Sequence, residues 1–236
     1  MKVIFAGPTL HGASFLPSAD CQFRPPARQG DLYGAVKEGA NVIGLIDGLY
    51  EYVPAIWHKE ILFGLSQGVH ILGAASMGAL RAAECAAFGM IGVGEIYRDF
   101  ASGLLEDDSD VAQAHAPPEM NFLPLSEPLV NVRATISRCL ELSRITDAEH
   151  DQLQYAAKRI FFKDRTYRHL VSSAIQGPDR AQRVLANLRE NKINLKLNDA
   201  LMLIEVVTRM PDCRFVAEFD WTFEATDFWT SVFSPS

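Results

Sequence analysis

The residues best suited to chemistry lie around Ser76, in the segment 73–79 (Gly-Ala-Ala-Ser-Met-Gly-Ala). This serine stands between an apolar run and an alanine-rich run with helix-forming character. With Ala74 two positions before it and Gly78 two positions after it, it forms an Ala-x-Ser-x-Gly variant of the nucleophile elbow. The backbone N–H groups of Met77 and Gly78 would lie free at the start of the helix, where they and the helix dipole favour an oxyanion. The pattern therefore suits nucleophilic attack on an acyl group.

Two simpler roles for Ser76 are also open. Serine is among the residues preferred at the N-cap of a helix, and the same strand-to-helix geometry binds phosphate without any chemistry. A serine hydroxyl is a weak nucleophile until a base takes its proton. A catalytic role therefore requires a second group.

Four side chains close in sequence are candidates for that base: His58, Lys59, Glu60 and His70. His70 falls in a predicted strand, where a packed imidazole is the favoured role. The other three lie in the predicted helix 53–67, which would run antiparallel to the strand that leads to Ser76. The long side chain of Lys59 could then meet the turn. Lysine acts as a base only where burial lowers its pKa toward neutrality, and a solvated surface lysine is the alternative.

Three more charged residues are supporting candidates. Arg81 and Glu84 are three positions apart on the predicted helix after Ser76, close enough to form an ion pair, and Arg81 could instead meet a carboxylate. Asp47 ends a predicted strand, although Asp-Gly is also an ordinary turn sequence.

The first hundred residues contain the elements that would position these groups. Apolar runs predict strands, and amphipathic or alanine-rich runs between them predict helices: strands at 2–7, 41–47 and 69–75, helices at 31–37, 53–67 and 77–88, and a fourth strand near 91–97. Strands that are apolar on both faces and alternate with helices indicate a small parallel sheet with flanking helices, an α/β fold with Rossmann-like layers. Ligand sites in such sheets lie at the carboxyl ends of the strands, where Asp47 and Ser76 fall.

From about residue 98 the character of the chain changes. Helical patterns cover most of the rest, and the predicted helices are 129–143, 147–162, 165–175, 178–191 and 197–210. We therefore expect an α/β domain at 1–98 and a mainly helical region at 99–236. The acidic cluster 106–110 reads as a solvated loop, with a cation or a basic partner surface as the alternative. The aromatic tail 215–233 is expected to pack back on the body rather than dock a partner.

Composition narrows the class of protein. The chain has 236 residues and a formal net charge of −7, which argues against a nucleic-acid partner. The four cysteines have neither zinc-ligand spacing nor the density of a disulfide framework, so we expect free thiols and no metal. The apolar start is too short for a signal peptide, and no run is long enough to cross a membrane. We expect a cytoplasmic protein with no cofactor.

Three motifs together resemble the TfuA-like protein family. They are 57–62 (Trp-His-Lys-Glu-Ile-Leu), 73–84 (Gly-Ala-Ala-Ser-Met-Gly-Ala-Leu-Arg-Ala-Ala-Glu) and 125–135 (Leu-Ser-Glu-Pro-Leu-Val-Asn-Val-Arg-Ala-Thr). The resemblance spans roughly residues 1–170. Proteins of this family act beside YcaO enzymes, which activate peptide backbone amides with ATP, and together they replace an amide oxygen by sulfur.

The resemblance implies a hydrolase that cleaves the C-terminal thiocarboxylate of a ThiS-like sulfur-carrier protein and releases sulfide for the YcaO partner, which modifies a precursor peptide or protein. The family's active site is described as a Ser–Lys pair, which matches Ser76 and Lys59 here. The N–H groups of Met77 and Gly78 would then hold the oxyanion, and the acidic loop 106–110 would help to orient the carrier. A non-catalytic adaptor that recruits the peptide and the sulfur carrier to the YcaO enzyme is the alternative.

Overall fold

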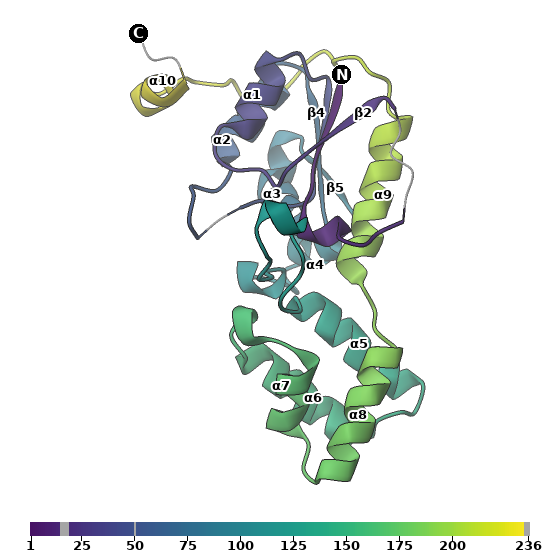
Figure 1. Cartoon of the computed structure of the whole chain (residues 1–236). Helices are drawn as coiled ribbons and strands as arrows, with labels where there is room; N and C mark the ends of the chain where they lie inside the picture. Colours follow the sequence, from purple (N-terminus) through teal and green to yellow (C-terminus); the bar gives the residue numbers. More distant parts are fainter. Residues whose placement is uncertain (15–18, 50, 234–236) are drawn as a thin grey trace.

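The computed structural model describes residues 1–14, 19–49 and 51–233. Its centre is a parallel sheet with the order β2-β1-β3-β4-β5 (Figure 1). The strands are β1 (Lys2–Phe5), β2 (Cys21–Arg24), β3 (Val42–Leu45), β4 (His70–Ala74) and β5 (Ile91–Val93). The predicted α/β fold with a parallel sheet is confirmed. Strand β2 was not predicted, because this half-buried edge strand has no apolar run.

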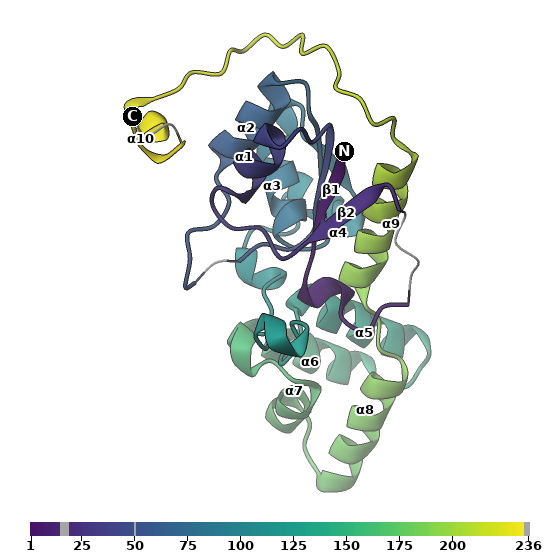
Figure 2. The ribbon, with the colours of Figure 1, turned by 45° about the horizontal axis from the view of Figure 1, so that its top comes forward.

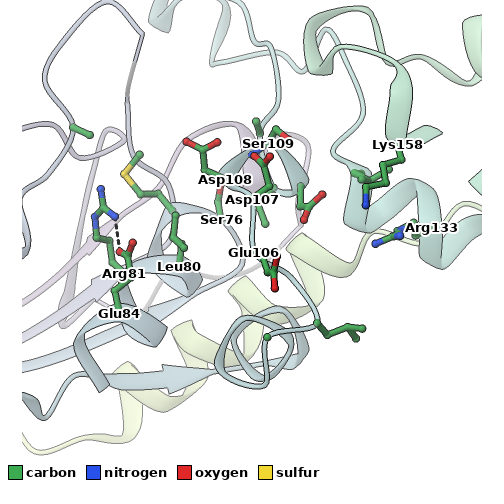
Figure 3. A pocket seen from close by; sticks show the side chains of 18 residues that line it. Ser76, Leu80, Arg81, Glu84, Glu106, Asp107, Asp108, Ser109, Arg133 and Lys158 are labelled. Atoms are coloured by element: carbon green, nitrogen blue, oxygen red, sulfur yellow. Dashed lines mark hydrogen bonds and ion pairs between the residues drawn. The ribbon is translucent and has the colours of Figure 1, made fainter. Parts of the chain in front are cut away.

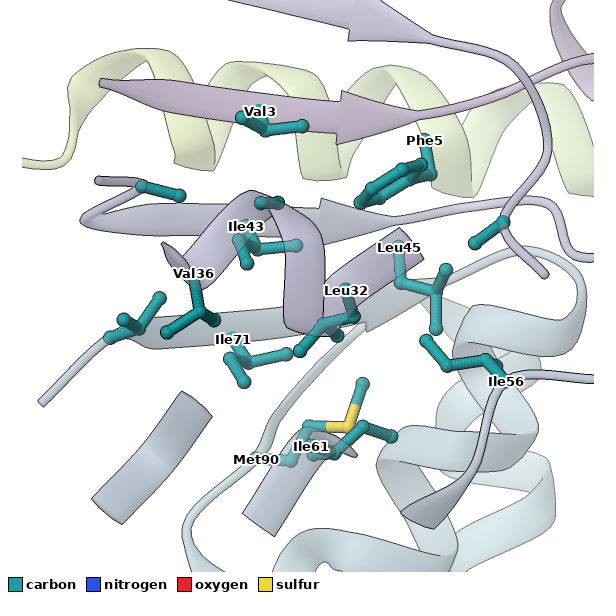
Figure 4. Packing of buried hydrophobic residues seen from close by; sticks show 14 of the residues in the cluster. Val3, Phe5, Leu32, Val36, Ile43, Leu45, Ile56, Ile61, Ile71 and Met90 are labelled. Carbon is teal, nitrogen blue, oxygen red and sulfur yellow. The ribbon is translucent and has the colours of Figure 1, made fainter. Parts of the chain in front are cut away.

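Helices cover both faces of the sheet. On one face α1 (Asp31–Lys37), α2 (His58–Ser66) and α3 (Met77–Cys85) pack against β1, β3 and β4. Figure 4 shows this core, in which Leu32 and Val36 of α1 and Ile61 of α2 meet Ile43 and Ile71 of the strands. Helix α9 (Leu195–Arg209) covers the opposite face, although it lies far along the chain. The α/β layer is thus completed by a helix from the C-terminal half.

Two predicted elements have different bounds in the structure. The helix predicted at 53–67 begins only at His58, because the Pro54 carbonyl accepts from the Gln29 N–H and the Glu60 carboxylate accepts from the Trp57 N–H, which sets the helix start there. The strand predicted at 91–97 ends at Val93 and gives way to α4 (Glu95–Ala101). The Asp199 carboxylate of α9 accepts from the first two N–H groups of α4 and so fixes its start.

A helical unit follows the sheet and lies below it in Figure 1. It consists of α5 (Leu129–Glu141), α6 (Asp147–Arg159), α7 (Tyr167–Ala174) and α8 (Pro178–Glu190), with its own apolar core. Short 3-10 helices occur at Pro8–Leu10, Ala86–Phe88, Asp108–Asp110, Pro118–Met120 and Phe162–Asp164. The segment 102–128 connects the sheet to this unit, and α9 leads back from it.

Residues 210–233 form a strap over the α1–α2 side of the sheet. After α9 the chain runs across the end of the sheet to α10 (Asp227–Phe233), as Figure 2 shows. Phe215, Phe219 and Trp221 pack against the sheet core. Trp229 of α10 contacts Phe63 of α2 at 5.5 Å between ring centroids. The prediction that the aromatic tail packs on the body is confirmed.

Within the described ranges, no helix has both the length and the hydrophobicity needed to cross a membrane. The same residues contain no group of three or more His, Cys, Asp or Glu side chains placed to hold a metal ion.

Candidate active site

Ser76 stands on a strained turn at the carboxyl edge of the sheet. Ala75 has a φ of +66°, which is uncommon for a residue with a side chain. The Ser76 N–H donates to the Ala74 carbonyl at 2.7 Å, closing a three-residue γ-turn between β4 and α3. Strain of this kind costs about 1–3 kcal/mol and gathers at functional sites. Ser76 is the N-cap of α3, yet its side chain makes no cap hydrogen bond, so the cap role does not occupy its hydroxyl.

The small residues around Ser76 are required by backbone packing. A Cβ on Gly73 would lie 2.0 Å from the Gly78 carbonyl oxygen, and a Cβ on Gly78 would lie 1.8 Å from the Leu45 carbonyl oxygen. The Gly78 N–H donates to the Ile46 carbonyl at 3.2 Å. One of the two predicted oxyanion donors is therefore engaged in holding α3 against β3. The Met77 N–H, at the first position of α3, donates to no partner among the described residues.

The larger of two cavities at Ser76 lies between α3 and the helical unit and has a volume of about 950 Å³. Figure 3 shows its charged lining, with Arg81 and Glu84 from α3 and with Arg133 and Lys158 from the helical unit. The acidic cluster 106–110 also lines it. This loop is therefore part of the wall of the Ser76 cavity.

The acidic side chains of this wall differ in their surroundings. The Ser109 backbone N–H donates to Asp107 at 2.8 Å, and this bond lowers the pKa of the Asp107 carboxyl. Partial burial raises the pKa of Asp108 and of Asp110 instead. The wall thus presents carboxyls of unequal acidity to the cavity.

Arg81 and Glu84 form the predicted ion pair, with 2.5 Å between Arg81 Nη1 and Glu84 Oε2. His58 joins them, because its Nε2 lies 2.8 Å from the same carboxylate oxygen. Arg81 Nε also donates to the Ile56 carbonyl at 3.3 Å. These contacts tie the start of α2 to α3 at the border of the cavity.

Two of the other base candidates have structural roles. The Glu60 carboxylate is fully buried and accepts from the backbone N–H groups of Gly30, Tyr33 and Trp57, so it holds the starts of α1 and α2 together. Burial is the largest influence on its pKa, which is raised. His70 packs against the ring of Phe215 at 4.9 Å, the packed imidazole that its strand position predicts.

Lys59 faces the C-terminal strap. Its Nζ donates to Thr226 Oγ1 at 3.3 Å and lies 5.6 Å from the centroid of the Phe223 ring. It lines neither of the cavities that contain Ser76. Successive side chains on an α-helix differ in direction by about 100°. Because His58 points to α3 and Glu60 to the start of α1, the side chain between them points away from both. The structure therefore does not bring Lys59 and Ser76 together.

The second cavity at Ser76, of about 230 Å³, contains Asp47 and a lysine that the sequence did not single out, Lys196 of α9. The Asp47 carboxylate accepts from the Gly7 N–H, the Thr9 N–H and the Thr9 hydroxyl at 2.6–3.0 Å. Lys196 Nζ lies 4.0 Å from Asp47 Oδ1 and donates to the Val111 carbonyl at 3.0 Å. Asp47 thus lies at the site, as its strand end predicts.

Lys196 is 2 % exposed, and its burial lowers the pKa of the ammonium group although Asp47 opposes the shift. The one sequence signal for it is its place on the buried stripe of α9, otherwise formed mainly by Ala200, Leu203, Ile204 and Val207. Nothing in the sequence links this stripe to Ser76. Only the return of α9 to the sheet brings the two residues to one cavity.

Comparisons with known proteins show the family of the chain. None of the curated proteins compared with the chain matches it. The family model described as TfuA-like protein matches residues 47–166, just over half of the chain. The matched range begins at Asp47, contains Ser76 and the acidic cluster, and ends before Lys196. The chain belongs to the TfuA-like protein family.

Proposed function

We propose that this protein is a serine hydrolase that cleaves the C-terminal thiocarboxylate of a ThiS-like sulfur carrier and supplies sulfide to a YcaO enzyme for peptide backbone thioamidation. The observation that carries the proposal is the placement of Ser76. Its side chain makes no cap hydrogen bond, it follows a strained turn, it starts a helix, and it lines both cavities at the carboxyl edge of the sheet. Membership of the TfuA-like family supports the choice of substrate and partner.

The reaction needs two steps at Ser76. First, Ser76 Oγ bonds to the thiocarboxylate carbon while a base takes its proton. The tetrahedral oxyanion lies at the start of α3, where the Met77 N–H and the helix dipole favour it. The C–S bond then breaks, and the sulfur leaves with that proton as hydrosulfide. Second, water hydrolyses the acyl-serine ester, which returns the hydroxyl and gives a carrier that ends in a carboxylate.

The larger cavity is suited to an extended chain end. A carrier that ends in Gly-Gly presents little side-chain volume, and the hollow of about 950 Å³ opens beside Ser76. Leu104 at its lining is 71 % exposed and offers an apolar contact at the rim. The acidic cluster 106–110 would orient basic groups of the carrier.

A specific observation favours a second candidate, the non-catalytic adaptor. Lys59, the residue that the family's Ser–Lys description assigns as base, contacts Thr226 and Phe223 of the strap. For Lys59 to serve Ser76, the strap would have to leave it. An adaptor that binds the YcaO enzyme and its peptide needs no such rearrangement.

Sulfide release from a thiocarboxylated carrier separates the two candidates. Ser76→Ala is expected to abolish release and to keep the wild-type circular dichroism spectrum. Ser102→Ala is the matched control, because this exposed serine ends α4 and its hydroxyl donates to the Asp99 carbonyl. Full release by Ser76→Ala, with unchanged enhancement of the YcaO reaction, would refute the hydrolase and support the adaptor.

A further inference from the structure

The burial of Lys196 needs an explanation that packing does not provide. An ammonium group withdrawn from water costs several kcal/mol unless ion pairing and hydrogen bonds compensate. Within the described part of the chain, the Lys196 ammonium donates one hydrogen bond, to the Val111 carbonyl, and has a carboxylate 4.0 Å away, beyond hydrogen-bond distance. That carboxylate, Asp47, is already occupied by three shorter donors. An apolar side chain at position 196 would avoid this cost and leave the folded protein more stable.

Lys196 lies beside the strand end that adjoins Ser76. Strands β3 and β4 pair in parallel with Leu45 opposite Gly73, so Asp47 and Ala75 are level at the same edge. Gly48 is in direct contact with the residue after Ser76, since a Cβ there would lie 2.3 Å from Met77 Sδ. Asp47, and Lys196 at 4.0 Å from it, therefore lie at the end of β3, which pairs with the strand that leads to Ser76.

Other lysines at the two Ser76 cavities lack this environment. Lys158 lines the larger cavity and is exposed. Lys163 lines the smaller one and pairs with Glu51 at 2.7 Å, which raises the pKa of the lysine. Among the lysines that line these cavities in the described chain, Lys196 alone is buried. Burial disfavours the charged form of Lys196.

We propose that Lys196, and not Lys59, is the base that takes the proton of Ser76, directly or through one water. This inference rests on the proposed hydrolase function and changes the assignment of its second residue. The neutral Nζ accepts the proton as Ser76 Oγ bonds to the carbonyl carbon. The resulting ammonium is stabilised by Asp47, and it returns the proton to the sulfur as the C–S bond breaks. The carrier loses hydrosulfide, and nothing is oxidised or reduced.

The charged groups around Lys196 set how the reaction responds to pH. Lys196 lines the smaller Ser76 cavity and, on its other side, a further cavity of about 740 Å³. The titratable and charged side chains that line the first are Asp47, Glu51, Tyr52, His115 and Lys163, and those that line the second are His11, Glu127, Tyr167, Arg168, Arg189 and Lys192. Burial favours the neutral amine of Lys196, whereas Asp47 favours the ammonium. The rate should rise with pH as Lys196 loses its proton.

Four variants test the proposal with thiocarboxylated carrier as substrate: Ser76→Ala, Lys196→Met, Lys196→Arg and Lys59→Met. Methionine replaces the base with an apolar chain of similar length. Arginine keeps the positive charge but stays protonated, so it cannot accept a proton. Both Lys196 variants are expected to lower kcat by about 10²–10⁴-fold, the usual contribution of a general base. Lys59→Met is the matched control and is expected to remain within about twofold of wild type.

Labelling of Ser76 by a fluorophosphonate gives a second readout that needs no carrier. Wild type should label faster as pH rises, and this dependence should vanish in Lys196→Arg. In Lys196→Ala, added methylamine should restore part of the labelling rate, which a purely structural lysine would not allow. Unchanged kcat in Lys196→Met with loss of activity in Lys59→Met would overturn the inference and leave the hydrolase standing. Full activity in Ser76→Ala would overturn the hydrolase itself.

Discussion

Replacement of Gly78 by alanine is the sharpest test of how the Ser76 turn is held. In the structure a Cβ at this position lies 1.8 Å from the Leu45 carbonyl oxygen and 2.6 Å from its carbon. Both atoms belong to the backbone of β3, so no side chain can rotate away. The start of α3 must therefore move from β3 by more than about 1 Å before the contact reaches the 3.0 Å that Cβ atoms keep.

The expected cost follows from two separate losses. Overpacking of a fixed backbone contact costs about 1–3 kcal/mol. The displacement also breaks the hydrogen bond from the Gly78 N–H to the Ile46 carbonyl, which is worth about 1 kcal/mol. Gly78→Ala should thus lower the free energy of unfolding by about 2–4 kcal/mol. Sulfide release should fall with it, because the same movement shifts Ser76 and the Met77 N–H.

A helical glycine with free space provides the matched control. Gly34 lies inside α1, and the nearest atom to an added Cβ is Glu38 Oε1 at 3.8 Å. Gly34→Ala should raise the free energy of unfolding by up to about 1 kcal/mol, since alanine favours the helix. Urea unfolding followed by circular dichroism measures both variants. If Gly78→Ala is as stable as Gly34→Ala, the close packing of α3 on β3 is refuted.

Two further predictions concern parts of the molecule away from Ser76. Glu149 receives two hydrogen bonds of 2.6 Å from Arg180, which lower the pKa of its carboxyl to about 2. Because the folded-state pKa lies below the ordinary value of 4.5, this pair stabilises the fold above about pH 4.5 and is lost as pH falls toward 2. Glu149→Gln should therefore be less stable than wild type by about 1–2 kcal/mol at pH 7 and nearly equal to it near pH 2, as urea unfolding would show. Phe63→Ala should release the strap, since Phe63 packs on Phe223 and Trp229. Faster limited proteolysis within residues 216–226 would show this release, and an unchanged cleavage pattern would contradict it.

The sequence predicted the sheet well because its signals are local. The apolar runs 2–5, 42–45 and 70–74 are themselves the strands β1, β3 and β4. Gly68, with a φ of +76°, follows the C-cap residue of α2 and marks the end of that helix. The Ser76 turn is local in the same sense, because Gly73 and Gly78 contact each other across it. Strand β2 was missed because it makes its hydrogen bonds with β1 and has no apolar signal of its own.

The sequence predictions were wrong about where a helix begins and about which way a side chain points. The start of α4 is set by Asp199 of α9, about a hundred residues later in the chain. The direction of Lys59 follows from a helix start at His58 that the sequence pattern placed five residues too early. The contact with Asp199 leaves no trace in the local pattern of 91–97, so periodicity alone could not reveal it.

The difference between local signals and distant contacts also explains why the sequence indicated bases close to Ser76 in the chain. Ser76, its turn and the Met77 N–H come from one segment, and the family match covers that segment together with Asp47. A base has to approach the carboxyl edge of the sheet from outside the turn, and α9 is the helix that reaches Asp47 from the opposite face. The helical unit lies between these two parts of the chain and supplies a wall of the larger cavity. The smaller cavity at Ser76 thus joins Asp47 of the matched segment to Lys196 of the returning helix, which is the residue that we propose as the base.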